Sequence, residues 1–317
     1  MKSFWQSLKK PIFVLAPMAD VTDAAFREVI AEKGKPDVFW TEFVSADGLV
    51  LAPEKGRQKL LKDLIYGEKE RPIVAQFFTS KPENMKAVAK LAEELGFDGI
   101  DINMGCPDKS VEKQGAGASL IKNPQLAREL IRSAKEGAPS LPVSVKTRLG
   151  YNKVEIETWL KELLAEEPAV VTIHARTRKE MSKVDAHWEY IKRAVEIRDE
   201  LGSETLIFGN GDALDLSDAR AKVVETGCDG VMLGRAIFGN PWLFAERVPS
   251  EEERLTTLVR HCELFEKYLG EVKSFAIMKK HFKSYTQGLK DATTLREKLM
   301  ATQSAEEVSR VVEEYLG

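Results

Sequence analysis

A cysteine in a short loop is the residue of this chain best placed for chemistry. Cys106 stands in Asn103-Met104-Gly105-Cys106-Pro107, directly after the apolar run 97–102. The glycine permits a sharp turn before the thiol, and the proline fixes φ after it. A thiol held in this way can donate or accept a proton or attack an electrophile, although most free cysteines are simply small buried hydrophobic residues. The loop position favours the reactive interpretation.

Other polar and small residues follow apolar, strand-like runs along the chain. In a barrel of parallel strands, functional side chains gather at the carboxyl ends of the strands. The residues in these positions are Ala16, Pro17, Met18, Gln76, Asn103, Lys146, His174, Arg176, Asn210, Gly211, Asp212, Gly234 and Arg235. We therefore expect them to surround one mouth, together with Cys106.

Two glycine turns suggest the kind of ligand that this mouth would take. Gly209-Asn210-Gly211-Asp212 and Gly234-Arg235 follow the seventh and eighth strand-like runs. They offer free backbone N–H groups and an arginine at the place where barrels commonly bind phosphate. One such turn would indicate only a tight loop, but the pair predicts a ligand that carries phosphate.

Lys146 and His174 indicate the chemistry of the same mouth. Lys146 follows the apolar run 143–145, so its ammonium should point into the barrel, where it needs an anion or a strongly polar partner. A flavin fits, because the reduced ring carries negative charge that a cation stabilises; a Schiff-base lysine remains an alternative. His174 could be an imidazole of the core, but the polar residues Lys146, Gln76 and Asn103 expected at the same mouth favour a role in ligand binding. The four histidines have no zinc-ligand spacing, so we expect no metal.

The elements that must position these residues alternate regularly. Strands are predicted at 12–16, 37–44, 72–78, 97–102, 142–147, 169–173, 205–208 and 230–233. Helix-like segments lie between the strands, for example at 22–33, 82–95, 124–136, 153–166, 188–198 and 215–226. Eight such units in this length are typical of a (β/α)8 TIM barrel. An open dinucleotide-binding sheet is disfavoured, because Pro17 occupies the place where its glycine-rich turn would lie.

The pattern changes after Pro241. Helices are predicted at 255–268, 272–287, 292–299 and 304–315, with no strand between them. We therefore predict a barrel domain at 1–245 and a small all-helical domain at 250–317.

Composition limits the classes of protein that remain. The chain has 317 residues, of which 43% are hydrophobic and 31% charged, with a net charge of −3 and three cysteines. These values predict a globular cytoplasmic protein without a disulfide framework. We find no signal peptide and no run long enough to cross a bilayer, so we expect no membrane contact. A monomer is expected.

The motifs together resemble the tRNA-dihydrouridine synthases, flavin enzymes that reduce uridines in tRNA. The resemblance depends on Asn103-Met104-Gly105-Cys106-Pro107, which is highly specific, and on less specific segments at 15–19, 76–77, 115–118, 145–148, 173–177, 209–212 and 230–235. Met278-Lys279-Lys280-His281-Phe282-Lys283-Ser284-Tyr285 resembles the C-terminal helical motif of the family, with Lys279 and Ser284 where arginine and tryptophan are frequent. The similarity covers nearly the whole chain.

The resemblance implies a role for each matched residue. Cys106 would be the proton donor to C5 of uracil, while reduced FMN gives hydride from N5 to C6 and NADPH, or less commonly NADH, reduces the flavin again. FMN would contact Ala16, Pro17, Met18, Gln76, Lys146, His174, Asn210, Gly211, Asp212, Gly234 and Arg235. The substrate would contact Asn103, Lys109, Arg176, Lys183, Lys279, Lys280 and Tyr285, with Lys146 and His174 also close to the uracil ring.

The predicted helical domain supports tRNA as the partner. Residues 273–298 contain seven basic side chains and two acidic ones, with three aromatic residues between them. Such a segment suits phosphate contacts and base stacking, although an isolated basic helix is often only a solvated face. Two alternatives remain open: an FMN barrel oxidoreductase acting on a small pyrimidine or enone, and an RNA-binding protein without activity.

Overall fold

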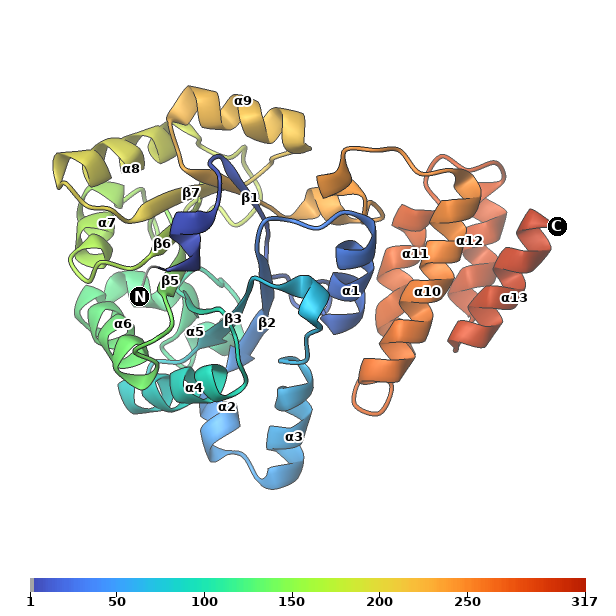
Figure 1. Cartoon of the computed structure of the whole chain (residues 1–317), viewed down its shortest axis with the longest axis horizontal. Helices are drawn as coiled ribbons and strands as arrows, with labels where there is room; N and C mark the ends of the chain where they lie inside the picture. Colours follow the sequence, from blue (N-terminus) through green and yellow to red (C-terminus); the bar gives the residue numbers. More distant parts are fainter. Residues whose placement is uncertain (1–2) are drawn as a thin grey trace.

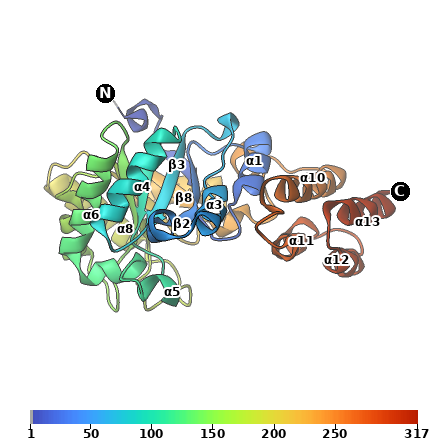
Figure 2. The ribbon, with the colours of Figure 1, turned by 90° about the horizontal axis from the view of Figure 1, so that it is seen from below.

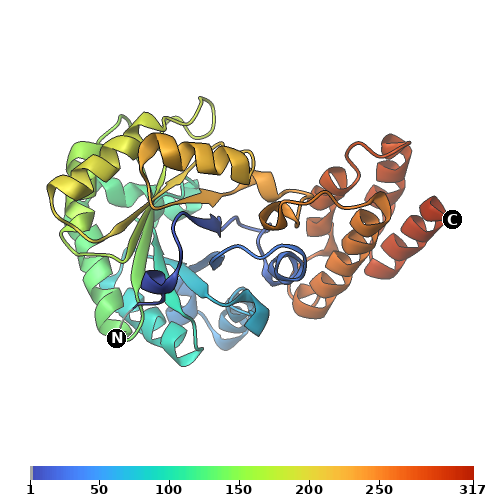
Figure 3. The same ribbon diagram turned by 45° about the horizontal axis from the view of Figure 1, so that its top comes forward.

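The computed structural model describes residues 3–317, and within them eight parallel strands form one curled sheet (Figures 1 and 3). The strands are β1 Ile12–Leu15, β2 Phe39–Ser45, β3 Ile73–Phe78, β4 Gly99–Asn103, β5 Val143–Arg148, β6 Val170–His174, β7 Leu206–Asn210 and β8 Gly230–Leu233. From β2 to β8 each strand pairs with the next one along the chain, and β8 pairs with β1. A single parallel bridge from Val14 to Val38 joins β1 to the start of the β2 segment. The predicted order of eight parallel strands is confirmed.

Helices follow the strands and cover the outside of the sheet (Figure 3). They are α1 Ala24–Lys33, α2 Ala46–Leu51, α3 Glu54–Lys62, α4 Pro82–Glu94, α5 Lys109–Glu112, α6 Pro124–Gly137, α7 Ile156–Leu164, α8 Glu189–Glu200 and α9 Leu216–Thr226. Short 3₁₀ helices lie at Phe4–Ser7, Glu68–Glu70, Gly117–Lys122, Arg235–Ile237 and Leu243–Ala245. Side chains of Asp23, Asn123 and Asp215 cap α1, α6 and α9, because each accepts a bond from a free amide of the first turn.

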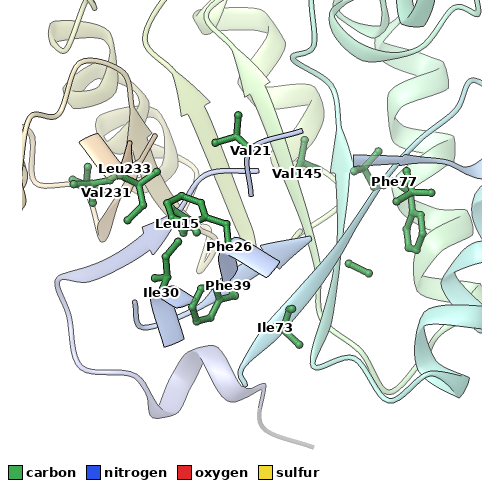
Figure 4. Packing of buried hydrophobic residues seen from close by; sticks show 14 of the residues in the cluster. Leu15, Val21, Phe26, Ile30, Phe39, Ile73, Phe77, Val145, Val231 and Leu233 are labelled. Carbon is green, nitrogen blue, oxygen red and sulfur yellow. The ribbon is translucent and has the colours of Figure 1, made fainter. Parts of the chain in front are cut away.

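The main core lies between the strands and the outer helices. Figure 4 shows Leu15 of β1 and Phe39 of β2 beside Phe26 and Ile30 of α1, and all four are fully buried. This apolar layer holds α1 against the barrel directly after the loop that follows β1. The β1–α1 loop is therefore anchored at both of its ends.

Aromatic rings close the amino-terminal end of the barrel. Trp5, from the first 3₁₀ helix, packs with its ring centroid 5.8 Å from that of Trp40 and 5.7 Å from that of Phe208. All three side chains are buried. The barrel therefore has an apolar floor, and its polar side chains face the opposite, carboxyl end.

Four helices follow residue 250 and lie to one side of the barrel (Figures 1 and 2). They are α10 Glu251–Leu269, α11 Lys279–Tyr285, α12 Ala292–Ala301 and α13 Ala305–Leu316, and we call residues 250–317 the C-terminal helical segment. Helix α10 packs against α1, where the ring of His261 stacks on Phe26 with centroids 4.8 Å apart. Among residues 3–317, no helix has the length and apolar character needed to cross a membrane.

One predicted helix of this segment is wrong. The expected helix 272–287 is divided into a 3₁₀ helix, Phe275–Met278, and the short helix α11. The side chain of Ser274 accepts a hydrogen bond from Ala276 N and so caps the 3₁₀ turn, which separates residues 270–274 as a loop. That loop leads back toward the barrel.

Candidate active site

A cavity of about 310 Å³ lies at the carboxyl ends of the strands. It is lined by Ala16, Pro17, Met18, Phe43, Asn103, Gly105, Cys106, Pro107, Lys146, Arg148, His174, Arg176, Ser182, Asn210, Gly211, Asp212, Ala213, Met232, Gly234 and Arg235. The structure thus brings together Cys106 and all but one of the cofactor-contact residues expected from the sequence. Gln76 is the exception.

The Cys106 loop is fixed by hydrogen bonds on both sides. The Asn103 side-chain oxygen accepts from the backbone N–H groups of Gly105, at 3.2 Å, and Cys106, at 2.9 Å. The Cys106 carbonyl accepts from Ala118 N at 2.9 Å. A Cβ on Gly117, which has φ +62°, would lie 2.6 Å from that carbonyl oxygen. The loop therefore requires glycine at 117 and leaves the thiol little freedom.

The thiol of Cys106 is half-buried and keeps its proton. Burial raises its pKa, and this effect exceeds the lowering caused by the Asp108 amide and by the nearby Arg148 and Lys146 cations. A thiol in this state is suited to donate a proton in a reaction.

Gln76 lies beneath the cavity and acts on it through Asn103. Its side chain is fully buried, accepts from Asn103 Nδ2 at 3.0 Å and donates to Asp101 Oδ2 at 2.6 Å. Asp101 also accepts from the Ser144 hydroxyl at 2.6 Å, and burial raises its pKa to about 6. This network sets the orientation of the Asn103 amide, which has one N–H left for a ligand.

Lys146 places a cation inside the cavity. Its Nζ donates to Asn210 Oδ1 at 3.1 Å, and Asn210 in turn donates to the Met232 carbonyl at 2.8 Å. Lys146 is half-buried, and this burial, with the charge of Arg148 close by, lowers its pKa to about 8. The remaining N–H groups of a buried ammonium need an acceptor, and an anionic ligand would supply one.

His174 is neutral in this environment. Burial lowers its pKa well below the ordinary value, and the cations of Arg148, Lys146 and Arg176 lower it further. Because Arg176 Nη1 can only donate and lies 3.2 Å from His174 Nε2, we assign the ring proton to Nδ1. His174 can therefore present one N–H donor.

Asp212 joins two arginines at the rim of the cavity. Its two carboxylate oxygens bind Arg176 and Arg235, and one of them also accepts from Ala186 N at 2.9 Å. Burial acts to raise the pKa of Asp212, but the Arg176 and Ala186 hydrogen bonds outweigh it and lower the value. A carboxylate held in this way fixes both guanidinium groups beside the glycine turns.

The predicted substrate contacts are spread more widely. Lys183 borders a hollow of about 570 Å³ beside the cavity, together with Arg176, Asp212 and Arg235. Lys109 is exposed on α5 and does not line the cavity, and Lys279 and Lys280 lie on α11. Tyr285 is fully buried in the helical core, with its hydroxyl 3.4 Å from His261 Nδ1. This burial argues against the predicted contact between Tyr285 and a substrate.

Arg148 is a cavity residue that the sequence analysis did not single out. It donates from Nε to the Gly105 carbonyl at 2.7 Å and from Nη1 to the Thr177 and Met181 carbonyls, each at 3.1 Å. Burial lowers its pKa to about 10. Its position two residues after Lys146 on a strand, and hence on the same face, was the signal that could have identified it.

The parallel barrel, with a thiol and several cations around a cavity at the carboxyl ends of its strands, defines an enzyme of the (β/α)8 class. The model of the family described as "Dihydrouridine synthase (Dus)" matches residues 14–316. The chain belongs to the dihydrouridine synthase family. Among the described residues, no group of three histidine, cysteine or acidic side chains is arranged to hold a metal ion.

Curated relatives match almost the full chain. A protein of Staphylococcus aureus (strain COL) named "Probable tRNA-dihydrouridine synthase" is 44% identical over 319 aligned residues, covering 99% of this chain and 96% of the relative. "Probable tRNA-dihydrouridine synthase 2" of Bacillus subtilis (strain 168) is 43% identical, with 99% and 97% covered.

Solved structures of more distant proteins share the fold. Histamine dehydrogenase from Rhizobium sp. 4-9 matches with a TM-score of 0.56 and 14% identity, over 80% of this chain and 48% of that one. A 2-naphthoyl-CoA reductase complex matches with a TM-score of 0.55 and 12% identity, over 74% and 49%. At these identities the likeness is one of fold alone.

Proposed function

We propose that this protein reduces the C5–C6 double bond of specific uridines in tRNA, with FMN as cofactor and NADPH, or less commonly NADH, as electron donor. One observation carries the proposal: a protonated cysteine thiol is fixed at the edge of a cavity lined by cations and strand-end amides. Membership of the dihydrouridine synthase family supports the same reaction.

The residues around the cavity suit FMN. Gly211 and Gly234 line the cavity beside Arg235, a combination of glycine turns and a cation that suits a phosphate group. Lys146 has N–H groups free for the electron-rich edge of a flavin, and Ala16, Pro17 and Met18 form one wall. We expect contacts from these residues and from His174, Asn210 and Asp212, while Gln76 would act by holding Asn103. When bound and reduced, FMN supplies the hydride that adds to C6 of uracil.

The chain itself supplies the proton and the orientation. The Cys106 thiol would donate its proton to C5, and the resulting thiolate would be stabilised by Arg148 and Lys146, whose charges act on that sulfur. Asn103 and the neutral His174 each offer a single N–H donor to the carbonyl oxygens of uracil. Arg176 and Lys183, next to the mouth, would hold the nucleotide phosphate.

The position of the cavity implies that the protein must also bind the RNA around the target base. A uracil base must leave its stack to enter a cavity at the end of a barrel, so the enzyme must grip the surrounding RNA. The C-terminal helical segment offers exposed lysines for this grip, among them Lys280 and Lys283 of α11. Lys280 Nζ lies 4.0 Å from Asp20 Oδ2, so this end of α11 is next to the loop that lines the cavity.

Replacing Lys280 and Lys283 with glutamate should weaken tRNA binding, because two phosphate contacts are lost and two repulsive charges are added. The plot of log binding constant against log salt should become shallower by about 1 for each phosphate contact removed. Filter binding at several salt concentrations measures both effects. Lys90→Glu, an exposed change on α4 of the barrel, is the control and should bind tRNA like the wild type. Equal affinity and slope in all three proteins would remove α11 from the RNA interface.

The reaction itself is tested by mapping dihydrouridine in tRNA from cells with and without this gene. We expect one or a few positions to lose the modification in the deletion strain and to regain it when the purified, FMN-loaded protein and NADPH are added. Free uridine monophosphate, supplied in the same assay, separates a tRNA enzyme from an oxidoreductase of small pyrimidines. Efficient reduction of the free nucleotide but not of tRNA would contradict the proposal. A monomeric state, a cytoplasmic location and a division into two domains remain predictions.

A further inference from the structure

Lys273 lies in the loop of the C-terminal helical segment that leads back to the barrel. Its side chain is 17% exposed, and its Nζ lies 2.8 Å from Asp63 Oδ1, 3.2 Å from Glu42 Oε2 and 3.6 Å from Asp20 Oδ1. The three carboxylates come from separate parts of the barrel: the end of α3, strand β2 and the β1–α1 loop. One ammonium of the helical segment thus connects three barrel elements.

The same contacts reach the wall of the cavity. Glu42, which is buried on β2, accepts a hydrogen bond from Asp20 N through its other oxygen. Asp20 has φ +53°, a left-handed backbone conformation that must be held in place in a non-glycine residue. Met18, two residues earlier, lines the cavity, and its N–H donates to Thr22 Oγ1 at 2.8 Å. Ion pairs and a hydrogen bond therefore join Lys273 to Asp20, and two residues of backbone join Asp20 to the cavity wall at Met18.

Without Lys273 the acidic groups would repel one another. Asp23, also buried, lies behind them and adds a further carboxylate. Burial raises the pKa of Glu42 to about 7, even though the charge of Lys273 acts to lower it. Burial alone would lower the pKa of Lys273, but the carboxylates of Glu42 and Asp63 raise it, so this lysine stays charged. The charged groups around Glu42 are Asp20, Asp23, Asp63 and Lys273, while Lys280 lies beyond them, with its Nζ 4.0 Å from Asp20 Oδ2.

We propose that Lys273 is a positioning residue that fixes the β1–α1 loop and the C-terminal helical segment in one arrangement, so that tRNA held by the segment meets a correctly shaped cavity. This inference depends on the proposed function for its substrate. It also changes the interpretation of the basic segment 273–298. The first lysine of this segment pairs with carboxylates of the barrel and is therefore not available to RNA phosphates.

The test compares Lys273→Met with Glu271→Gln. Glu271 forms the neighbouring ion pair with Lys62, at 3.6 Å, but is 85% exposed, so its loss should have little effect. In Lys273→Met we expect the KM for tRNA and the dissociation constant of FMN from the apoprotein each to rise about tenfold, within the usual range for coupled sites, with a smaller change in kcat. Hydrogen exchange of residues 16–22 should become faster in this variant alone.

The pH dependence separates this role from a general loss of structure. In Lys273→Met the defect should be larger at pH 8 than at pH 6, because protonation of Glu42 at the lower pH relieves the repulsion. Adding Glu42→Gln to Lys273→Met should restore part of the FMN affinity at pH 8. Unchanged FMN affinity and unchanged exchange of residues 16–22 in Lys273→Met would overturn the inference. Exchange and FMN binding do not require turnover, so they decide it even if the wild type forms no dihydrouridine.

Discussion

Cys106→Ala protein should form dihydrouridine on the order of 10² to 10⁴-fold more slowly than the wild type while binding FMN equally well. The effect is expected on the chemical step because the side chain removed is the one placed to give the proton. The loop itself should survive, since its hydrogen bonds use the backbone of Cys106 and the side chain of Asn103. Single-turnover oxidation of the reduced enzyme by tRNA measures the step directly.

Two comparisons make this result specific. Cys228→Ala, at a buried cysteine that does not line the cavity, should keep wild-type turnover. Alkylation of Cys106 by iodoacetamide should be slow at neutral pH and accelerate as pH rises, because burial raises the pKa of this thiol and only the thiolate reacts. Wild-type turnover in Cys106→Ala would show that another group donates the proton.

Lys146→Met should lower kcat/KM by about 100-fold or more, since it removes a preorganised donor and the charge inside the cavity. The same substitution should also abolish a proton uptake that accompanies FMN binding in the wild type. The pKa of Lys146 is lowered to about 8, so above that pH part of the empty protein carries a neutral amine. An anionic ligand stabilises the ammonium, and FMN binding near pH 8.5 should therefore take up a proton in the wild type.

Calorimetric titration of the apoprotein with FMN in two buffers of different ionisation enthalpy measures this uptake. Lys146→Met should show none, and Lys192→Met, an exposed change on α8, should behave like the wild type. Equal proton uptake in Lys146→Met and the wild type would mean that Lys146 does not interact with the bound flavin.

The sequence was sufficient to predict most of what repeats in this fold. Apolar runs of strand length, together with caps such as Asn123 and Asp215, locate the strands and most helices to within a few residues. Helices α2 and α3 were not predicted, nor was the four-residue helix α5. Gly48 lies inside the six-residue helix α2, and Pro53 separates it from α3. None of the nine residues of α3 is buried, so no apolar face marks this helix in the sequence.

The candidate site was predictable where it depends on strand ends and not where it depends on contacts between distant segments. Cys106, Lys146 and His174 come together because each lies near the carboxyl end of a parallel strand, either within it or just after it. The network through Gln76 and the carbonyl contacts of Arg148 involve partners about 25 to 43 residues apart, which no local pattern reveals. Lys273 was counted correctly among the basic residues, but it was assigned to the RNA-facing set. Its contact with barrel carboxylates depends on tertiary packing, which the local sequence does not reveal.

The aromatic floor of the barrel has a consequence for the order of events. Trp5, Trp40 and Phe208 fill the amino-terminal end, so the cavity opens at the carboxyl end, where both tRNA and the nicotinamide donor would have to arrive. Two large reactants that use the same opening would bind one after the other, so the oxidised donor would dissociate before the RNA binds. The bound flavin would then hold the two electrons after the donor has left and before the RNA binds. This order of binding is a ping-pong mechanism, which gives parallel lines in double-reciprocal plots of the initial rate.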